Sequence, residues 1–194
     1  MVRLLKVRSP ERLGSPRPSP WHRGATIIVF LLGACRDTLG PGDIEPDLSA
    51  PVQSSALYYL VEKDELGWNG LVPVSYVNRS GQPVFLDLCE TWLEWLPNRT
   101  WVKAHQGVCP GGPGFLPPTR IDPGQAFQLD YRFSHWFDPN VLPRFPTDPP
   151  TSGVYRVVMQ FYARTEVVDG VEEPRDPLPL DSGRSNAFWL EFPP

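Results

Sequence analysis

The chain has 194 residues, of which 18 are basic and 22 acidic, giving a formal net charge of −4. Proline is its most unusual component, at 25 residues, or about 13% against roughly 5% in ordinary proteins. Because proline lacks the amide N–H and clashes with the preceding helical turn, this content excludes long helices over most of the chain. The stretches between the prolines are rich in Val, Tyr, Phe and Trp, which indicates an all-β protein.

A mostly apolar run over residues 25–34 follows a basic stretch and ends at Cys35. Its length is about half of what a helix needs to span a bilayer. It therefore favours the apolar region of an export signal over a permanent anchor, and we predict a signal peptide over 1–34. A buried strand that ends in cysteine, or an uncleaved signal anchor, are the alternatives.

The end of this run, Leu32-Gly33-Ala34-Cys35, resembles the bacterial lipobox. The resemblance implies that Cys35 becomes the first mature residue and carries a diacylglyceryl group, with a further acyl chain on its new amino group. The chain would then contact the membrane through this lipid anchor. Arg36 occupies the position at which Asp retains such proteins at the inner membrane, so the resemblance implies the outer membrane.

Removing residues 1–34 leaves 160 residues, with 12 basic and 21 acidic side chains and a net charge of −9. This is the size of one ordinary domain. The only lysines left are Lys63 and Lys103. A nucleic-acid-binding face needs clustered Lys and Arg to neutralise phosphates, so the composition excludes nucleic acid as a partner.

The segment after Cys35 is polar and is punctuated by proline and glycine. We predict a flexible tether over 35–55, which leads to a β-sandwich domain over 56–194. The alternative is a first strand or loop that packs on the domain near Ile44 and Leu48.

Strand-like runs then follow one another at short intervals. The first is 56–61, and the second is 71–77, where Val72, Val74 and Tyr76 alternate with other residues as in a half-buried strand. The turn at 78–81 predicts a hairpin between 71–77 and 83–88. A second hairpin is expected between 91–96 and 100–105.

The remaining elements follow from composition and alternation. The Gly- and Pro-rich stretch 107–120 is expected to cross from one sheet to the other. Alternation predicts an amphipathic strand over 125–133, and the longest apolar run, 154–165, predicts a central strand. An acidic loop and a last strand over 186–192 complete the expected order.

The cysteines fit an exported protein. With Cys35 acylated, Cys89 and Cys109 remain as an even pair, symmetric about Arg99 in the second hairpin turn. A hairpin folded there brings both to its open end, so we predict a disulfide worth roughly 3 kcal/mol. Two separate buried thiols are the alternative.

Short strands with turns every ten or so residues predict an antiparallel β-sandwich of about seven to eight strands, with a barrel as the alternative. The motif from Thr151 to Tyr155, TSGVY, resembles the tyrosine corner of immunoglobulin-like folds. Together with the Asn-Arg-Ser-Gly turn, the Pro-Gly turn and the Phe-rich last strand, it resembles small bacterial immunoglobulin-like domains, including those similar to an intracellular proteinase inhibitor. The resemblance implies an immunoglobulin-like sandwich in which the Tyr155 phenol bonds back to the backbone.

The sequence contains no nucleophile motif and no phosphate loop. The three histidines lie in unrelated contexts and no Cys-x-x-Cys spacing occurs, so no metal site is expected. We therefore predict no catalytic residues and no cofactor. Glu90 with Glu94, or Glu172 with Glu173, could form an acid and base pair, but these residues are more typical of solvated charges.

The candidate ligand-binding residues are tryptophans: Trp92, Trp95 and Trp101 in the second hairpin, and Trp136 in the loop after 125–133. Exposed tryptophans can bind a sugar ring or a partner's side chain. The alternative is that they fill the core. Trp92 and Trp95 are three residues apart, so they share a face only if the strand has a bulge.

These observations predict a non-enzymatic, lipid-anchored domain of the cell envelope that binds an unidentified protein partner or acts as an accessory element. A carbohydrate-binding lipoprotein that uses the tryptophans is the first alternative. A hydrolase with a site built on the loops is the second.

Overall fold

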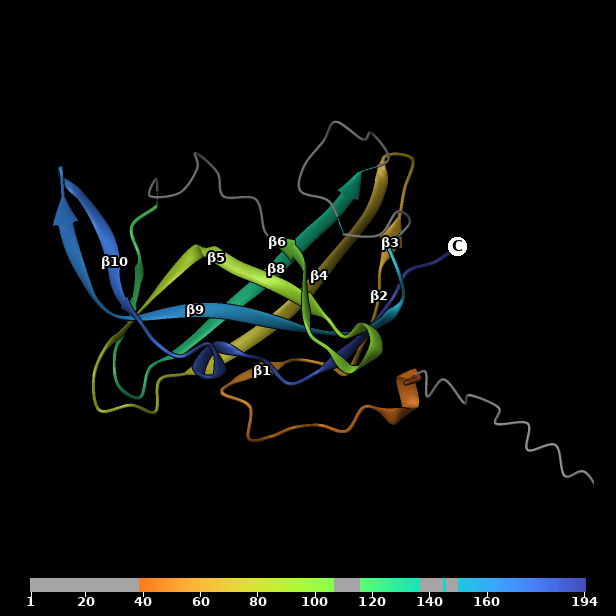
Figure 1. The fold of residues 1–194 in the computed structure, drawn as a ribbon, viewed down its shortest axis with the longest axis horizontal. Coiled ribbons are helices and arrows are strands. Elements are labelled where there is room, and N and C mark those ends of the chain that lie inside the picture. Colours follow the sequence, from red (N-terminus) through yellow and green to blue (C-terminus); the bar gives the residue numbers. More distant parts are fainter. Residues whose placement is uncertain (1–38, 107–115, 137–144, 146–149) are drawn as a thin grey trace, which may run out of the picture. The chain divides into compact units, whose positions relative to one another are not determined.

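The computed structural model describes residues 39–106, 116–136, 145 and 150–194. Within these ranges the chain forms eleven strands in two sheets (Figure 1). It also forms three short 3-10 helices: η1 (Pro41–Asp43), η2 (Pro97–Arg99) and η3 (Leu180–Gly183). None of the described helices is long and apolar enough to cross a membrane.

The smaller sheet has four strands: β1 (Val52–Ser54), β3 (Glu62–Lys63), β4 (Gly67–Val77) and β8 (Ala126–Trp136). β4 pairs with β8 along its whole length in antiparallel register, from Gly67 opposite Trp136 to Val77 opposite Ala126. The other edge of β4 pairs with β1 at one end and with β3 at the other.

The larger sheet has seven strands: β2 (Tyr58–Leu60), β5 (Val84–Trp95), β6 (Val102–Gln106), β7 (Thr119–Ile121), β9 (Gly153–Val168), β10 (Val171–Pro177) and β11 (Phe188–Glu191). β9 lies at its centre, as the sequence predicts, with β5 on one edge and β10 and β11 on the other. β2 and β11 form a parallel pair. In Figure 1 the β4–β8 pair crosses the β5–β9 pair diagonally.

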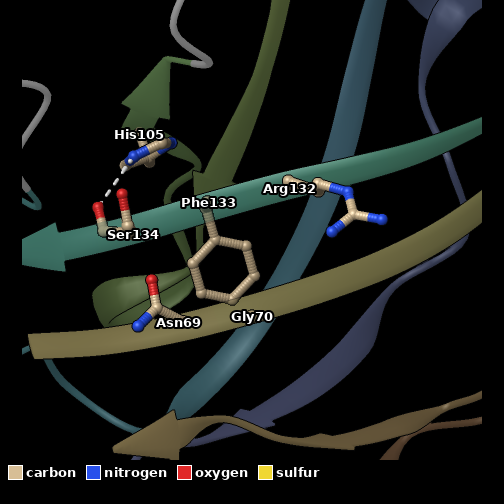
Figure 2. A pocket seen from close by; sticks show the side chains of 6 residues that line it. All are labelled: Asn69, Gly70, His105, Arg132, Phe133 and Ser134. Atoms are coloured by element: carbon tan, nitrogen blue, oxygen red, sulfur yellow. Dashed lines mark hydrogen bonds between the residues drawn. The ribbon is translucent and has the colours of Figure 1, made fainter. Parts of the chain in front are cut away.

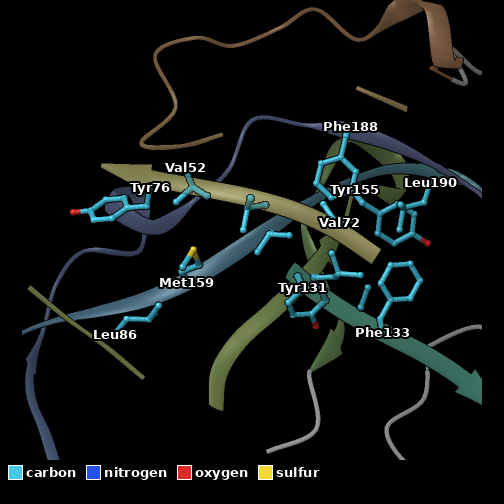
Figure 3. Packing of buried hydrophobic residues seen from close by; sticks show 14 of the residues in the cluster. Val52, Val72, Tyr76, Leu86, Tyr131, Phe133, Tyr155, Met159, Phe188 and Leu190 are labelled. Atoms are coloured by element: carbon cyan, nitrogen blue, oxygen red, sulfur yellow. The ribbon is translucent and has the colours of Figure 1, made fainter. Parts of the chain in front are cut away.

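One hydrophobic core lies between the two sheets (Figure 3). β4 contributes Val72 and Val74, which are 0% and 3% exposed, and β9 contributes Tyr155 and Val157, which are 1% and 0% exposed. Inward residues alternate with outward ones, as a pleated strand requires. The all-β fold with two sheets around one core is therefore confirmed, while the immunoglobulin-like topology stays a prediction.

The hydrogen bond expected of a tyrosine corner is present. The Tyr155 hydroxyl donates to the Thr151 carbonyl oxygen at 2.7 Å, four residues back along the chain. Burial raises the pKa of the Tyr155 phenol, so the hydroxyl keeps its proton and remains a donor. This bond holds the entry to β9 against the end of the core.

We expect Tyr155→Phe to lower the free energy of unfolding by about 1.5 kcal/mol, because it removes a buried hydrogen bond without changing the volume of the ring. Urea denaturation measures the change. Tyr58→Phe is the matched control, since Tyr58 is 47% exposed. Equal losses in the two variants would contradict a stabilising role for the corner.

The boundary of the expected tether is corrected. Residues 41–49 are mostly exposed, and Leu48 is 81% exposed, as a tether over 35–55 predicts. Val52 is instead fully buried and lies in β1, opposite Tyr76 of β4. Asn186 fastens the same strand to the larger sheet, because its Oδ1 accepts the Ser54 amide at 2.7 Å. The sandwich therefore begins at residue 52.

The expected hairpin between 71–77 and 83–88 is wrong. β4 and β5 belong to different sheets, and the partner of β4 is β8. The turn between them is held by the fully buried Asn78, whose Nδ2 donates to the carbonyls of Gln82 (2.8 Å) and Ile121 (2.9 Å). These bonds tie the turn to the start of β5 and the end of β7, so the chain crosses between sheets here.

The expected crossing over 107–120 is also misplaced. Residues 107–115 lie outside the described ranges, but β7 still belongs to the larger sheet and β8 to the smaller one. The change of sheet comes at the Asp122–Gln125 turn, in which Gly124 has φ +78°. The Pro-Gly pair predicted the turn itself correctly.

The acidic loop expected after 165 is a hairpin instead. β9 runs on to Val168 and pairs with β10. The turn residues Asp169 and Gly170 have φ of 52° and 83°. An Asp-Gly pair with two positive φ angles is the turn that suits a two-residue hairpin. The Asp-Gly pair is a local hairpin signal that the sequence carries within this acidic segment.

Candidate functional site

The second expected hairpin, which carries three of the candidate tryptophans, is confirmed as β5 and β6. The register between these strands shifts between Leu93 and Glu94, where Ala104 of β6 is the extra residue, so β5 keeps its regular alternation and Trp92 and Trp95 lie on opposite faces. Trp92 lies opposite Val158 of β9, and the Lys103 ammonium lies 4.7 Å from the centre of its ring. Trp92 is therefore a half-buried ring that is partly covered by a cation.

Trp101 is the second ring beside a cation. The Arg156 guanidinium lies 4.0 Å from the centre of the Trp101 ring and also forms an ion pair with Glu94 at 2.6 Å. The Arg156 and Glu94 side chains are only 13% and 12% exposed. Desolvation lowers the pKa of Arg156, and the hydrogen bond that Arg156 donates to the Glu94 carboxylate counteracts this shift. Trp101, Arg156 and Glu94 thus form a stacked polar cluster outside the core.

Trp95 does not belong to an exposed binding surface. Trp95 packs against the core, with its ring stacked on Tyr155 at 6.4 Å between centres. A Cβ on Gly153 would lie 2.9 Å from the Trp95 indole nitrogen. Trp95 is therefore a packing residue, the alternative that the sequence left open, because the regular alternation of β5 turns it inward while Trp92 stays outside. The Trp136 side chain lies outside the described set.

The disulfide between Cys89 and Cys109 remains a prediction. Cys89 is 7% exposed, and its carbonyl accepts a hydrogen bond from Gln106 Nε2 at 3.1 Å. Trp92 lies opposite Gln106 and Leu93 opposite His105. Cys109, the predicted partner of Cys89, and Cys35 both lie outside the described residues, so the disulfide and the lipid attachment stay predictions.

The carboxylate pairs considered from the sequence have separate structural partners. Glu90 accepts the hydroxyl of Tyr162, while Glu94 binds Arg156. Glu172 accepts the Thr165 hydroxyl at 2.5 Å, and Glu173 binds Arg175 at 2.7 Å. Within the described ranges no three His, Cys, Asp or Glu side chains are grouped as a metal site.

A hollow of about 310 Å³ opens where β4, β6 and β8 meet (Figure 2). It was not expected from the sequence. Among the described residues, six line it: Asn69, Gly70, His105, Arg132, Phe133 and Ser134. Asn69 lies opposite Ser134 in the β4–β8 register, and Arg132 is two residues from Ser134 on β8. These three polar residues alternate with buried ones, so they share the outer face of the four-stranded sheet.

Gly70 forms the floor of the hollow, and the buried Phe133 ring lies beneath it on the core side. The Phe133 ring packs against Gly70, so closely that a Cβ on Gly70 would be 2.1 Å from Phe133 Cζ (Figure 2). Any larger residue at position 70 would displace the ring. A glycine inside a strand often marks such a close approach, and this was the one signal in the sequence that could have pointed to the hollow.

His105 fixes one wall of the hollow. Its Nδ1 lies 3.1 Å from the Tyr131 hydroxyl and its Nε2 lies 3.2 Å from the Ser134 carbonyl. The ring is 3% exposed and packs 5.1 Å from Phe145, centre to centre. His105 therefore joins β6 to β8 and holds the backbone beside Ser134 in place.

The polar rim of the hollow contains groups without partners among the described residues. Asn69 Nδ2 donates to Asp64 Oδ2 at 2.9 Å, which leaves Oδ1 directed toward Ser134 (Figure 2). The Arg132 side chain is exposed and makes no ion pair or hydrogen bond within the described part of the chain. The rim thus offers a free cation, an oxygen acceptor and a hydroxyl.

Searches of protein-family models, of curated proteins and of solved structures find no match to this chain. The functional argument therefore rests on the residues and geometry described above.

Proposed function

We propose that the chain is an exported, lipid-anchored protein of the cell envelope, held at the outer membrane by Cys35, whose β-sandwich is a non-enzymatic binding domain for a protein partner. The lipobox-like sequence before Cys35 supports the anchor. The function of the domain would be recognition, displayed at a distance from the lipid surface.

The main support for this proposal is the exposed segment that connects Cys35 to the first strand of the sandwich. The segment before β1 is mostly exposed over 41–49, and its hydrogen bonds are local, such as those from Ser49 and Gln53 to Asp47. Between Cys35 and Val52 the chain can span at most about 60 Å. Val52 then enters the sandwich and is completely buried. An exposed connection that leads directly into a rigid domain suits a display role.

The outer surface around β5 and β6 supports recognition of a protein. Trp92 and Trp101 are half-buried and are paired with Lys103 and Arg156. Aromatic rings beside cations resemble the composition of interface centres, in which Trp and Arg are enriched. Among the described strands, β6 is also at the edge of the larger sheet, with Val102 37% exposed.

A labelled-palmitate experiment in growing cells tests the anchor. We expect the wild-type chain to incorporate label and to fractionate with membranes, and we expect Cys35→Ser to abolish both, because the thiol is the site of acylation. The Cys89→Ser/Cys109→Ser double variant is the control and should keep its label. Equal labelling of wild type and Cys35→Ser, or label in neither, would overturn the proposal.

Carbohydrate binding is the second candidate, and the hollow at Arg132 favours it more than the tryptophans do. The faces of Trp92 and Trp101 are partly covered by cations and Trp95 is packed on the core, so these rings offer no continuous stacking surface. The hollow instead presents polar groups around a nonpolar floor.

A further inference from the structure

We propose that the hollow between β4 and β8 binds an acidic sugar, a hexuronic acid, with Arg132 on its carboxylate and with Asn69 and Ser134 on its hydroxyls. The inference rests on the proposed function in one respect, namely that the domain is a binding module. It names a ligand class for a site separate from the β5–β6 surface.

The charge of the rim selects an anionic ligand. A guanidinium binds a carboxylate through two parallel hydrogen bonds, which makes arginine the preferred partner for this group. Arg132 is available for such a contact, since it has no acidic partner among the described residues. Five other arginines of the described chain do hold one: Arg120, Arg156, Arg164, Arg175 and Arg184.

The acidic side chains near the rim form no ion pair with Arg132 in the described structure. Asp64 is occupied, because its Oδ1 accepts the amides of Leu66 and Gly67 at 2.8 and 2.9 Å and its Oδ2 accepts Asn69. Asp130, two residues away on the same face of β8, forms no ion pair with Arg132 in the described structure.

The other rim groups select hydroxyls on the same ligand. Asn69 Oδ1 can only accept a hydrogen bond, and the Ser134 hydroxyl can accept or donate one. Ser134 and Arg132 are two residues apart on one strand, so their Cα atoms lie about 6.8 Å apart. A single sugar ring, with its carboxylate at one end and hydroxyls at the other, spans this separation.

The size and the floor of the hollow fit one ring. Its volume of about 310 Å³ lies at the small end of the range for ligand pockets, roughly 300–1,000 Å³. Gly70 has no side chain and leaves a nonpolar floor on the outer face, against which the C–H face of a pyranose can pack, while the buried Phe133 ring lies beneath it on the core side. Inorganic anions use the guanidinium but gain nothing from this floor.

The purified full-length chain should be titrated at low ionic strength with D-glucuronate, D-glucose, acetate and inorganic phosphate, with binding followed by NMR. We expect saturable binding of glucuronate and at least tenfold weaker binding of the other three. Arg132→Met should weaken glucuronate at least tenfold, and Asn69→Ala at least threefold. Both side chains lie on an exposed face, so circular dichroism should show unchanged folding.

Arg79→Met is the matched control, because Arg79 is also exposed and lies in the turn after the other end of β4. It should leave the affinity for glucuronate unchanged. Equal binding of glucose, acetate or phosphate would overturn the assignment to an acidic sugar, as would an equal loss in Arg79→Met or no binding at all. Such a result would leave the lipid anchor intact, since the palmitate experiment tests it separately.

Discussion

Replacement of Gly183 by alanine is expected to lower the free energy of unfolding by about 3 kcal/mol and the melting temperature by about 9 °C. A Cβ on Gly183 would lie 1.8 Å from the Met159 carbonyl oxygen, which belongs to the backbone of the central strand. Backbone cannot move aside as a flexible side chain can. The segment must therefore lift away from β9, which breaks the hydrogen bonds from Leu178 to Phe161 and from Ser185 to Val157, both 2.8 Å.

Thermal unfolding followed by circular dichroism measures this effect. Gly81→Ala is the control, because a Cβ there meets no atom within 4 Å and the residue has no positive φ. It should change stability by less than about 0.5 kcal/mol. If Gly183→Ala melted at the wild-type temperature, the close packing of η3 on β9 would be wrong.

The second large effect is expected for Arg156→Met, which should cost about 3 kcal/mol of unfolding free energy. The substitution leaves the Glu94 carboxylate 12% exposed and without the guanidinium that binds it at 2.6 Å. Removing one member of a buried ion pair costs more than removing both, since the remaining charge stays desolvated. It also removes the cation that lies 4.0 Å from the Trp101 ring.

A double-mutant cycle in urea tests this reasoning. Glu94→Leu combined with Arg156→Met should be more stable than Arg156→Met alone, because no charge is left buried. Arg164→Met serves as the surface control. Its partner is Asp176, and the two side chains are 57% and 61% exposed, so the cost should stay below about 1 kcal/mol. A double variant less stable than Arg156→Met would contradict the buried-charge argument.

Local features of the sequence were sufficient to predict several elements. The alternation of Val72, Val74 and Tyr76 identified β4 and the face that it buries, because the side-chain period of a strand is two. The apolar run around Val157 identified the central strand for a similar reason. The motif that ends in Tyr155 predicted a hydrogen bond to the backbone four residues earlier, and that bond is present.

The pairing partner of each strand could not be predicted from such local features. The turn at 78–81 has the residues of a hairpin, yet β4 pairs with β8. Alternation specifies which face of a strand is buried, but two strands with matching faces can pair edge to edge or pack face to face across a core. Asn78 distinguishes these cases through its bond to Ile121, 43 residues away, and such a contact leaves no local trace.

The sequence by itself determined the all-β character, the burial pattern of the main strands, the β5–β6 hairpin and the expectation of a lipid anchor at Cys35, because each depends on neighbouring residues or on composition. Only the tertiary structure decided the sites. Gly70 meets Phe133, and Glu94 meets Arg156, across more than 60 residues of sequence. The hollow at Arg132 and the cluster under Trp101 exist because non-local strand pairing brings these side chains together. The energy of that pairing is distributed over whole sheets, so no short segment of the sequence specifies it.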